Sequence, residues 1–136
     1  MAATHLADVS AWGQLHRADV AVRLSALLVS GAAATCGVTD LEVAAAALDE
    51  ADHRAIASER GLFPRVPVDD AVLGRAIEVQ ELLVGMAVPL EALVVAAAAE
   101  RAGLVVLHHD PAFDLIAAVT GQATEWVTPS GTAPEG

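Results

Sequence analysis

Three carboxylates stand just beyond short apolar segments, where a parallel sheet would gather its chemistry. Asp8 ends the first such segment, and Asp110 follows the run Leu104–Leu107. Glu42 lies six residues after the run Ala32–Cys36, in the first turn of an expected helix. In an open parallel sheet, ligands bind outside the carboxyl ends of the strands. Carboxylates that converge there repel one another unless a cation such as Mg²⁺ or Mn²⁺ neutralises them, and such an ion can activate water for phosphodiester hydrolysis.

Each of these acids also has a purely structural explanation. Asp8 can be a turn or cap residue before the next helix. Glu42 can be the reciprocal half of a capping box with Thr39, and Asp110 can be only an N-cap before Pro111. Taken singly, each acid leaves both interpretations open. The succession of strand–Asp, strand–helix–Glu and strand–Asp in a chain of this length favours the functional one.

The elements that must position these acids alternate between short apolar strands and helices. We expect strands at residues 5–8, 32–36, 104–107 and 124–127. We expect helices at residues 10–17, 18–30, from Thr39 onward, 49–60, 69–84, 89–101 and 111–121. Unbroken apolar strands separated by helices are typical of a parallel sheet buried on both faces. The pattern predicts a three-layer α/β/α domain with a short-stranded, mostly parallel central sheet over residues 1–127, followed by a flexible tail at residues 128–136.

Composition excludes several classes of chemistry. The 136 residues include seven basic side chains, all of them Arg, and 18 acidic ones, for a net charge of −11. Without Lys there is no Walker-A phosphate loop and no Schiff-base enzyme. The negative charge argues against sequence-blind binding of nucleic acid through a basic face and favours an acidic site or a basic partner. The hydrophobic fraction of 55% is enough for a packed core.

The same composition suggests where the chain works. Cys36 stands alone, which excludes an intrachain disulfide and makes a reducing cytoplasm the expected location. No basic segment precedes an apolar stretch near Met1, as a secretory signal would require. The longest apolar window, residues 82–99, is rich in Ala and contains Glu91 and Pro89. That window therefore predicts a buried helix rather than a membrane span.

Four segments spread from residue 5 to residue 127 resemble one known family. They are residues 5–11 with Asp-x-Ser-Ala, residues 36–42 with Thr-Asp-Leu-Glu, the apolar helix 93–100, and residues 104–113 followed by Ile116-Ala117 and Thr124-Glu125-Trp126-Val127. The block Leu-Val-Val-Leu-His-His-Asp-Pro-Ala-Phe at 104–113 is the most specific. Together the segments resemble a PIN-domain ribonuclease of the VapC toxin type, from type II toxin–antitoxin systems.

The resemblance implies a PIN-like fold and a metal-dependent endoribonuclease toxin that cleaves RNA. Asp8, Glu42 and Asp110 would be the catalytic acids. Asp8 and Asp110 would hold Mg²⁺ or Mn²⁺, with Glu42 as a further candidate ligand. Asp114, four residues after Asp110 on the same helix face, is either another ligand or a solvated acid of the first turn. The resemblance also implies a homodimer and a cognate VapB-type antitoxin that covers the active site.

Two positions depart from the family pattern. The family usually has Asp at the position of Ala92 and often has an acid at the position of Ala112. Three explanations of Ala92 stay open: a deliberate Asp-to-Ala change that makes a toxic protein safe to produce, a naturally weakened homologue, or a register shift by which Glu91 serves instead. A shift of one residue turns a helical side chain by about 100°, which counts against the last explanation. Because a lost ligand weakens metal binding, an inactive chain is one expected outcome.

Two other functions stay open on the sequence alone. One is a catalytically dead PIN-fold binding module that acts through complex formation with the antitoxin. The other is an unrelated doubly wound α/β domain that binds a small molecule, which would require Asp8, Glu42 and Asp110 to lie far apart.

The remaining polar candidates carry weaker signals. Adjacent residues of a strand point to opposite faces, so His108 and His109 are expected in framework roles or in hydrogen bonds near the acids rather than as a metal pair. Trp12 and Trp126 are expected in the core or at a dimer contact. Each Arg, including Arg17 near Asp8 in sequence, is expected on the surface or in a salt bridge.

Overall fold

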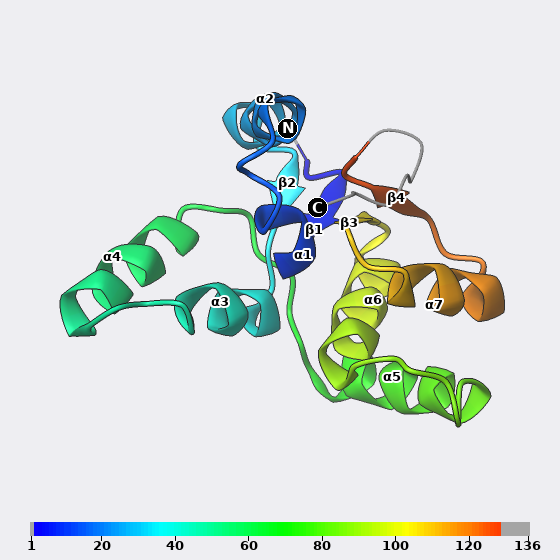
Figure 1. Cartoon of the computed structure of the whole chain (residues 1–136). Coiled ribbons are helices and arrows are strands. Elements are labelled where there is room, and N and C mark those ends of the chain that lie inside the picture. Colours follow the sequence, from blue (N-terminus) through cyan, green and yellow to red (C-terminus); the bar gives the residue numbers. More distant parts are fainter. Residues whose placement is uncertain (1, 129–136) are drawn as a thin grey trace.

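A four-stranded parallel sheet forms the centre of the molecule. The computed structural model describes residues 2–128, and its strands are β1 (His5–Ala7), β2 (Ala33–Ala34), β3 (Val105–His108) and β4 (Thr124–Trp126). Their order across the sheet is β2-β1-β3-β4, and every neighbouring pair is parallel (Figure 1). The predicted parallel sheet is confirmed, and its two central strands, β1 and β3, are the ones that lead into Asp8 and Asp110.

Within the described residues, seven helices connect and cover the strands. They are α1 (Val9–Trp12), α2 (Ala18–Val29), α3 (Gly37–Ala44), α4 (Glu50–Arg60), α5 (Asp70–Leu82), α6 (Leu90–Ala102) and α7 (Ala112–Thr120). The Asp49 and Asp69 carboxylates cap α4 and α5 by accepting bonds from backbone N–H groups of the first turn. Gly103 ends α6 with a φ of 72°, a left-handed conformation that favours glycine.

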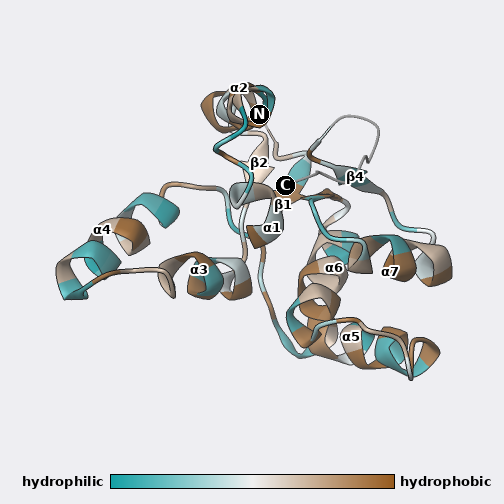
Figure 2. Cartoon of the chain, viewed as in Figure 1, coloured by the Kyte–Doolittle hydropathy of each residue, from teal (hydrophilic) through white to brown (hydrophobic). Residues whose placement is uncertain are grey.

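Alternate strand residues enter two separate cores, one on each face of the sheet. Leu6 and Val106 pack with residues of α5, α6 and α7, whereas Ala7 and Leu107 pack with residues of α1 and α2. Seven residues of α6 are buried, five of them Ala, so this helix approaches the sheet closely. In Figure 2, α6 is coloured mainly as apolar, whereas α4 alternates between hydrophilic and hydrophobic residues. The predicted three-layer arrangement is therefore confirmed.

The pair α3–α4 lies to one side of the sheet, away from α5 and α7 (Figure 1). Helix α3 nevertheless touches both α1 and α6. It therefore lies between the helix that follows Asp8 and the helix that contains Ala92. None of the helices between residues 2 and 128 is both long enough and apolar enough to cross a membrane.

Two of the predicted helix boundaries differ from the structure, and most of the predicted tail lies outside the described residues. The helix expected at residues 10–17 is only α1, which ends at Trp12 and is followed by turns. Helix α3 begins at Gly37, two residues before the predicted cap Thr39, because Cys36 is the N-cap and the Thr39 side chain is buried. Of the tail expected at residues 128–136, only Thr128 lies within the described residues, and it is buried.

The central strand β3 predicts a large dependence of stability on one side chain. Leu107 is fully buried, and Leu107→Ala should lower the free energy of unfolding by about 2–5 kcal/mol in urea denaturation because it leaves a cavity beneath α1 and α2. Leu41 is 74% exposed, so Leu41→Ala is the matched control and should change stability by less than about 0.5 kcal/mol. Equal effects of the two substitutions would contradict the assignment of the core.

Candidate active site

Strand β1 ends in Asp8, which is 5% exposed and is held by the helix that follows it. Its Oδ2 atom accepts bonds from the backbone N–H of Ser10 at 2.9 Å and from the Ser10 hydroxyl at 2.6 Å, so Asp8 caps α1. Burial raises the pKa of Asp8, the bonds from Ser10 oppose this rise, and the charge of Asp110 adds to it. The structural role that the sequence left open is present, and it coexists with coupling to a second acid.

The Ser10 hydroxyl joins Asp8 to the connection between β3 and α7. It donates to Asp8 and accepts a bond from the backbone N–H of His109 at 2.9 Å. The place of Asp8 relative to the segment that contains Asp110 is therefore fixed by a bonded bridge. Ser10 belongs to the Asp-x-Ser-Ala motif, but no role was predicted for it. The spacing Asp-x-Ser was the available signal, since it lets the hydroxyl reach back to the carboxylate.

Asp110 lies between β3 and α7. Its Oδ1 atom accepts a bond from the backbone N–H of Ala112 at 2.9 Å. The N-cap of α7 is Pro111, so the prediction that Asp110 is the N-cap is wrong, and its carboxylate instead holds the turn just before the helix. Its own backbone N–H donates to Nδ1 of His108 at 3.2 Å. The backbone and the side chain of Asp110 are thus both held in place.

His108 supports this connection from the interior. Its ring is fully buried against Phe113, with centroids 4.9 Å apart, and against Trp126, with centroids 5.1 Å apart. Burial lowers the pKa of His108 to about 4, so the ring is neutral at physiological pH. His108 is a framework residue, as expected from its place in a strand.

Glu42 is the sixth residue of α3, too far from the start of the helix to complete a capping box. The structural alternative for Glu42, a capping box with Thr39, is therefore excluded. Its Oε1 atom is buried and has no hydrogen-bond partner among residues 2–128. Burial, the charge of Asp8 and the charge of Glu91 together raise the pKa of Glu42 to about 7. A buried carboxylate oxygen with no donor is the kind of group that a cation would stabilise.

The three predicted acids form an electrostatic group rather than a closed metal cage. Asp8 is coupled to Asp110 on one side and to Glu42 on the other, although the three residues come from separate elements. Across residues 2–128, no three His, Cys, Asp or Glu side chains lie close enough together to hold a metal ion. The oxygen donors and the unpartnered Oε1 of Glu42 match the chemistry of a hard divalent cation. The donor types fit Mg²⁺ or Mn²⁺, although the described side chains do not form a three-ligand site.

Helix α6 adds a fourth carboxylate to this group, that of Glu91, the residue next to Ala92. Ala92 is buried in the core and carries no functional group. Glu91, in the first turn of α6, is exposed, yet its charge contributes to the raised pKa of Glu42. This effect on Glu42 supports the explanation of Ala92 in which Glu91 serves instead. It does so even though adjacent side chains point about 100° apart around a helix.

Asp114 is engaged elsewhere. Both of its carboxylate oxygens accept the indole N–H of Trp126 at 3.2 Å. Asp114 is also absent from the charges that shift the pKa of Asp8 or of Glu42. The suggestion that it compensates for Ala92 stays a prediction, and the contact with Trp126 speaks against it.

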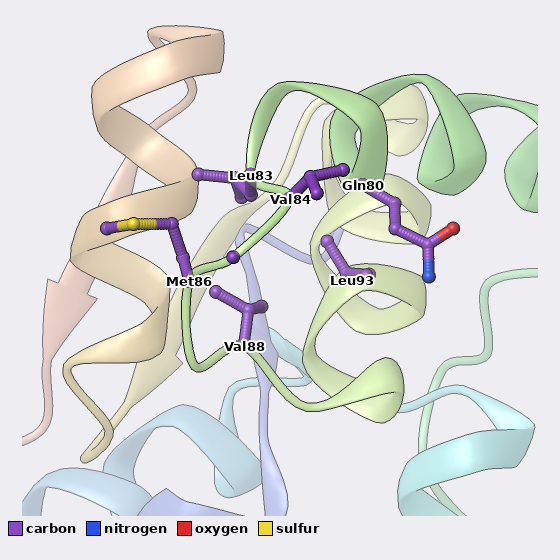
Figure 3. Close-up of a pocket in the computed structure, with 7 residues that line it drawn as sticks. Gln80, Leu83, Val84, Met86, Val88 and Leu93 are labelled. Atoms are coloured by element: carbon purple, nitrogen blue, oxygen red, sulfur yellow. The ribbon is translucent and has the colours of Figure 1, made fainter.

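A cavity of about 270 Å³ beside the α5–α6 connection is separate from the acids. It contains no ionisable side chain, so it cannot supply acid–base or metal chemistry. Its lining consists of Gln80, Leu83, Val84, Gly85, Met86, Val88 and Leu93 (Figure 3).

No protein-family model matches the sequence, but comparison with individual proteins finds clear relatives. The chain is 39% identical over 138 residues to Ribonuclease VapC21 of Mycobacterium tuberculosis strain H37Rv, an alignment that covers 98% of this chain and 100% of the relative. It is also 39% identical to Ribonuclease VapC51 of the same strain, with 97% and 98% of the two chains covered.

Solved structures share the fold. VapBC from Salmonella typhimurium bound to DNA gives a TM-score of 0.74 at 17% identity, with 93% of this chain and 99% of that chain covered. VapBC-5 from Mycobacterium tuberculosis gives a TM-score of 0.60 at 26% identity, with 91% and 97% covered. The near-complete coverage at 39% identity is decisive, and the chain belongs to the VapC ribonuclease family.

Proposed function

We propose that this chain is an endoribonuclease toxin that hydrolyses RNA phosphodiester bonds with the help of Mg²⁺ or Mn²⁺. The observation that carries the proposal is the coupling of Asp8, Glu42 and Asp110 beyond the carboxyl ends of β1 and β3. The ribonuclease names of relatives that match nearly the whole chain support the same reaction. Membership of this family removes the alternative of an unrelated small-molecule binder.

The proposed roles follow from the way each acid is held. Asp8 and Asp110 are the proposed metal ligands, because Ser10 and the start of α7 fix their carboxylates. A bound Mg²⁺ or Mn²⁺ would supply an activated water and stabilise the leaving oxygen. Glu42, with a pKa of about 7, is suited to hold the cation when ionised or to take up a proton near neutral pH.

The basic side chains near the acids give RNA a local point of attachment. The charge of Arg17 contributes to the lowered pKa of His109, after the larger effect of burial, and Asp110 acts on the same ring in the opposite sense. Arg17 is therefore close to the connection that carries Asp110, and we assign it a contact with the RNA phosphate. A chain with a net charge of −11 needs such local contacts because its overall field repels RNA.

A VapB-type antitoxin is the proposed inhibitor. The solved structures that share the fold are described as VapBC complexes and as a toxin–antitoxin complex from Klebsiella pneumoniae. The excess of acidic over basic residues suits a basic partner, and a basic side chain of the antitoxin could neutralise the acid group in place of a metal. The proposed place of action is the cytoplasm, where the RNA substrate is found.

A second copy of the chain is the proposed partner of α5 and of the connection to α6. Large apolar side chains are exposed along this stretch: Ile77, Leu82, Val84, Met86 and Leu90. Clustered apolar groups of this kind mark protein interfaces more often than isolated ones do.

This assignment predicts the effect of a charge on α5. Ile77→Glu should shift the chain from dimer to monomer in analytical ultracentrifugation, because it places a carboxylate in an apolar contact, while circular dichroism should show that the monomer remains folded. Val22→Glu, at a site 71% exposed on α2, is the control and should leave the dimer intact. A dimer that tolerates Ile77→Glu would show that the interface lies elsewhere.

Ala92 gives a specific reason to keep one alternative, a catalytically dead module that acts through its antitoxin complex. The ribonuclease names of the relatives do not favour this alternative. Restoring the expected acid separates the two functions.

Ala92→Asp should increase Mn²⁺-dependent cleavage of RNA by at least about tenfold over the present chain, since it adds a ligand to an incomplete site. EDTA should abolish the cleavage, and Asp8→Asn in the restored chain should remove it. Failure of a folded Ala92→Asp chain to cleave RNA would contradict the nuclease assignment.

Glu91→Gln in the unrestored chain should remove residual cleavage if Glu91 serves in place of the missing Asp.

The raised pKa of Glu42 predicts a pH dependence with a defined sign. The metal-free fold favours neutral Glu42, so this group stabilises the fold fully below its unfolded pKa of 4.5, and that contribution is lost as the pH rises through about 7. Metal binding requires the ionised form, so calorimetry should show Mn²⁺ affinity rising by roughly tenfold between pH 6 and pH 8. Glu42→Gln should remove both effects, and a flat pH profile in the unmodified chain would contradict the role of Glu42.

A further inference from the structure

Arg60, the last residue of α4, is a buried cation outside the acid group. It is 2% exposed, whereas the sequence predicted a surface or salt-bridged role for every Arg. Arg60 does form a salt bridge, with Asp40, but it does so in the interior rather than on the surface. A guanidinium leaves water at a considerable free-energy cost unless charge and hydrogen-bond partners surround it.

The polar partners of Arg60 come from α3 and from the residue that follows β2. Its Nε atom donates to Oδ1 of Asp40 at 2.9 Å, and its Nη2 atom donates to the Thr35 hydroxyl at 2.7 Å. That hydroxyl donates in turn to Oδ1 of Asp40 at 2.8 Å, while Arg65 donates to Oδ2. Burial alone would raise the pKa of Asp40, but the bonds from Arg65, Arg60 and Thr35 lower it below its ordinary value. Asp40 is therefore ionised at neutral pH, and its carboxylate accepts bonds from all three side chains.

The flat face of Arg60 meets two aromatic rings. The central guanidinium carbon lies 4.9 Å from the ring centroid of Trp12 and 4.7 Å from that of Phe63. The two rings are themselves stacked, with centroids 5.6 Å apart and planes inclined by 6°. Cation–π attraction is strongest where water is excluded, as it is around this buried group.

These contacts make Arg60 a bridge between the two helices that present acids. Trp12 ends α1, whose N-cap is Asp8, and Asp40 lies two residues before Glu42 in α3. The Asp8 and Glu42 carboxylates repel each other, which favours separation of α1 from α3 when no cation is bound. A side chain anchored to both helices opposes that separation.

We propose that Arg60 is a positioning residue that holds α1 and α3 together, fixes the spacing of Asp8 and Glu42, and so sets the affinity of the acid group for a divalent cation. This inference rests on the proposed metal-dependent function. It assigns Arg60 no contact with metal or RNA.

Arg60→Lys is the test variant, because Lys keeps the charge near Asp40 but loses the planar fork and the stacking face. Arg75→Lys is the matched control. Arg75 is likewise paired with a carboxylate, that of Glu100, although it uses two nitrogens, at 2.7 and 3.2 Å, where Arg60 uses one. It joins α5 to α6 rather than α1 to α3. Both full-length variants are compared with the unmodified chain at a temperature where circular dichroism shows all three folded.

Two measurements are made on these proteins. Calorimetric titration with Mn²⁺ at pH 8 should show a dissociation constant roughly tenfold weaker for Arg60→Lys and unchanged for Arg75→Lys. Amide hydrogen exchange without metal should become faster in α1 as well as in α3 for Arg60→Lys, and in neither helix for Arg75→Lys. A role confined to the stability of α4 would not change exchange in α1.

The outcomes separate this inference from the proposed function. Unchanged Mn²⁺ affinity in folded Arg60→Lys, or unchanged exchange in α1, would overturn the positioning role. If the unmodified chain bound no Mn²⁺, the proposed metal site would fail, and with it the part of the inference that concerns affinity. The exchange measurement would still decide whether Arg60 joins the two helices.

Discussion

Mutual repulsion between the buried carboxylate of Asp8 and the half-buried carboxylate of Glu42 is the constraint that the surrounding structure has to meet. Each lies in a place where burial and a neighbouring negative charge disfavour ionisation. Hydrogen bonds from Ser10 hold the first, while the second sits in a helix fastened by the Asp40–Arg60 network. The fold keeps like charges close, which is useful only when a cation or a basic partner joins them.

The sheet brings Asp8 close to the segment that contains Asp110. Strands β1 and β3 are the central pair, and the Asp8 backbone N–H still donates to Leu107 at the end of their ladder, at 2.9 Å. Helix α6 packs tightly against one face through small side chains. That same packing buries Ala92, so the position at which the family expects an acid belongs to the core in this chain. The charge of the adjacent Glu91 reaches Glu42 from the exposed side of the helix.

Local signals were sufficient for the parallel sheet and for the capped ends of α4, α5 and α6. Apolar strands, capping Asp residues and Gly103 act within a few residues of themselves, so their effects can be read along the chain. The start of α3 was misplaced because burial of Thr39 outweighed its resemblance to a cap. The burial of Arg60 depends on Trp12, Thr35 and Asp40, which are distant in sequence. Contacts between residues so far apart leave no pattern in the local sequence.

The most direct test of the account is a crystal structure of the chain soaked with Mn²⁺ at pH 8, with the metal located by its anomalous scattering. We expect a peak within bonding distance of the Asp8 and Asp110 carboxylates, with the Glu42 carboxylate turned toward it. A folded chain with no peak at these carboxylates under millimolar Mn²⁺, or with the metal bound only elsewhere, would contradict the assignment of the site.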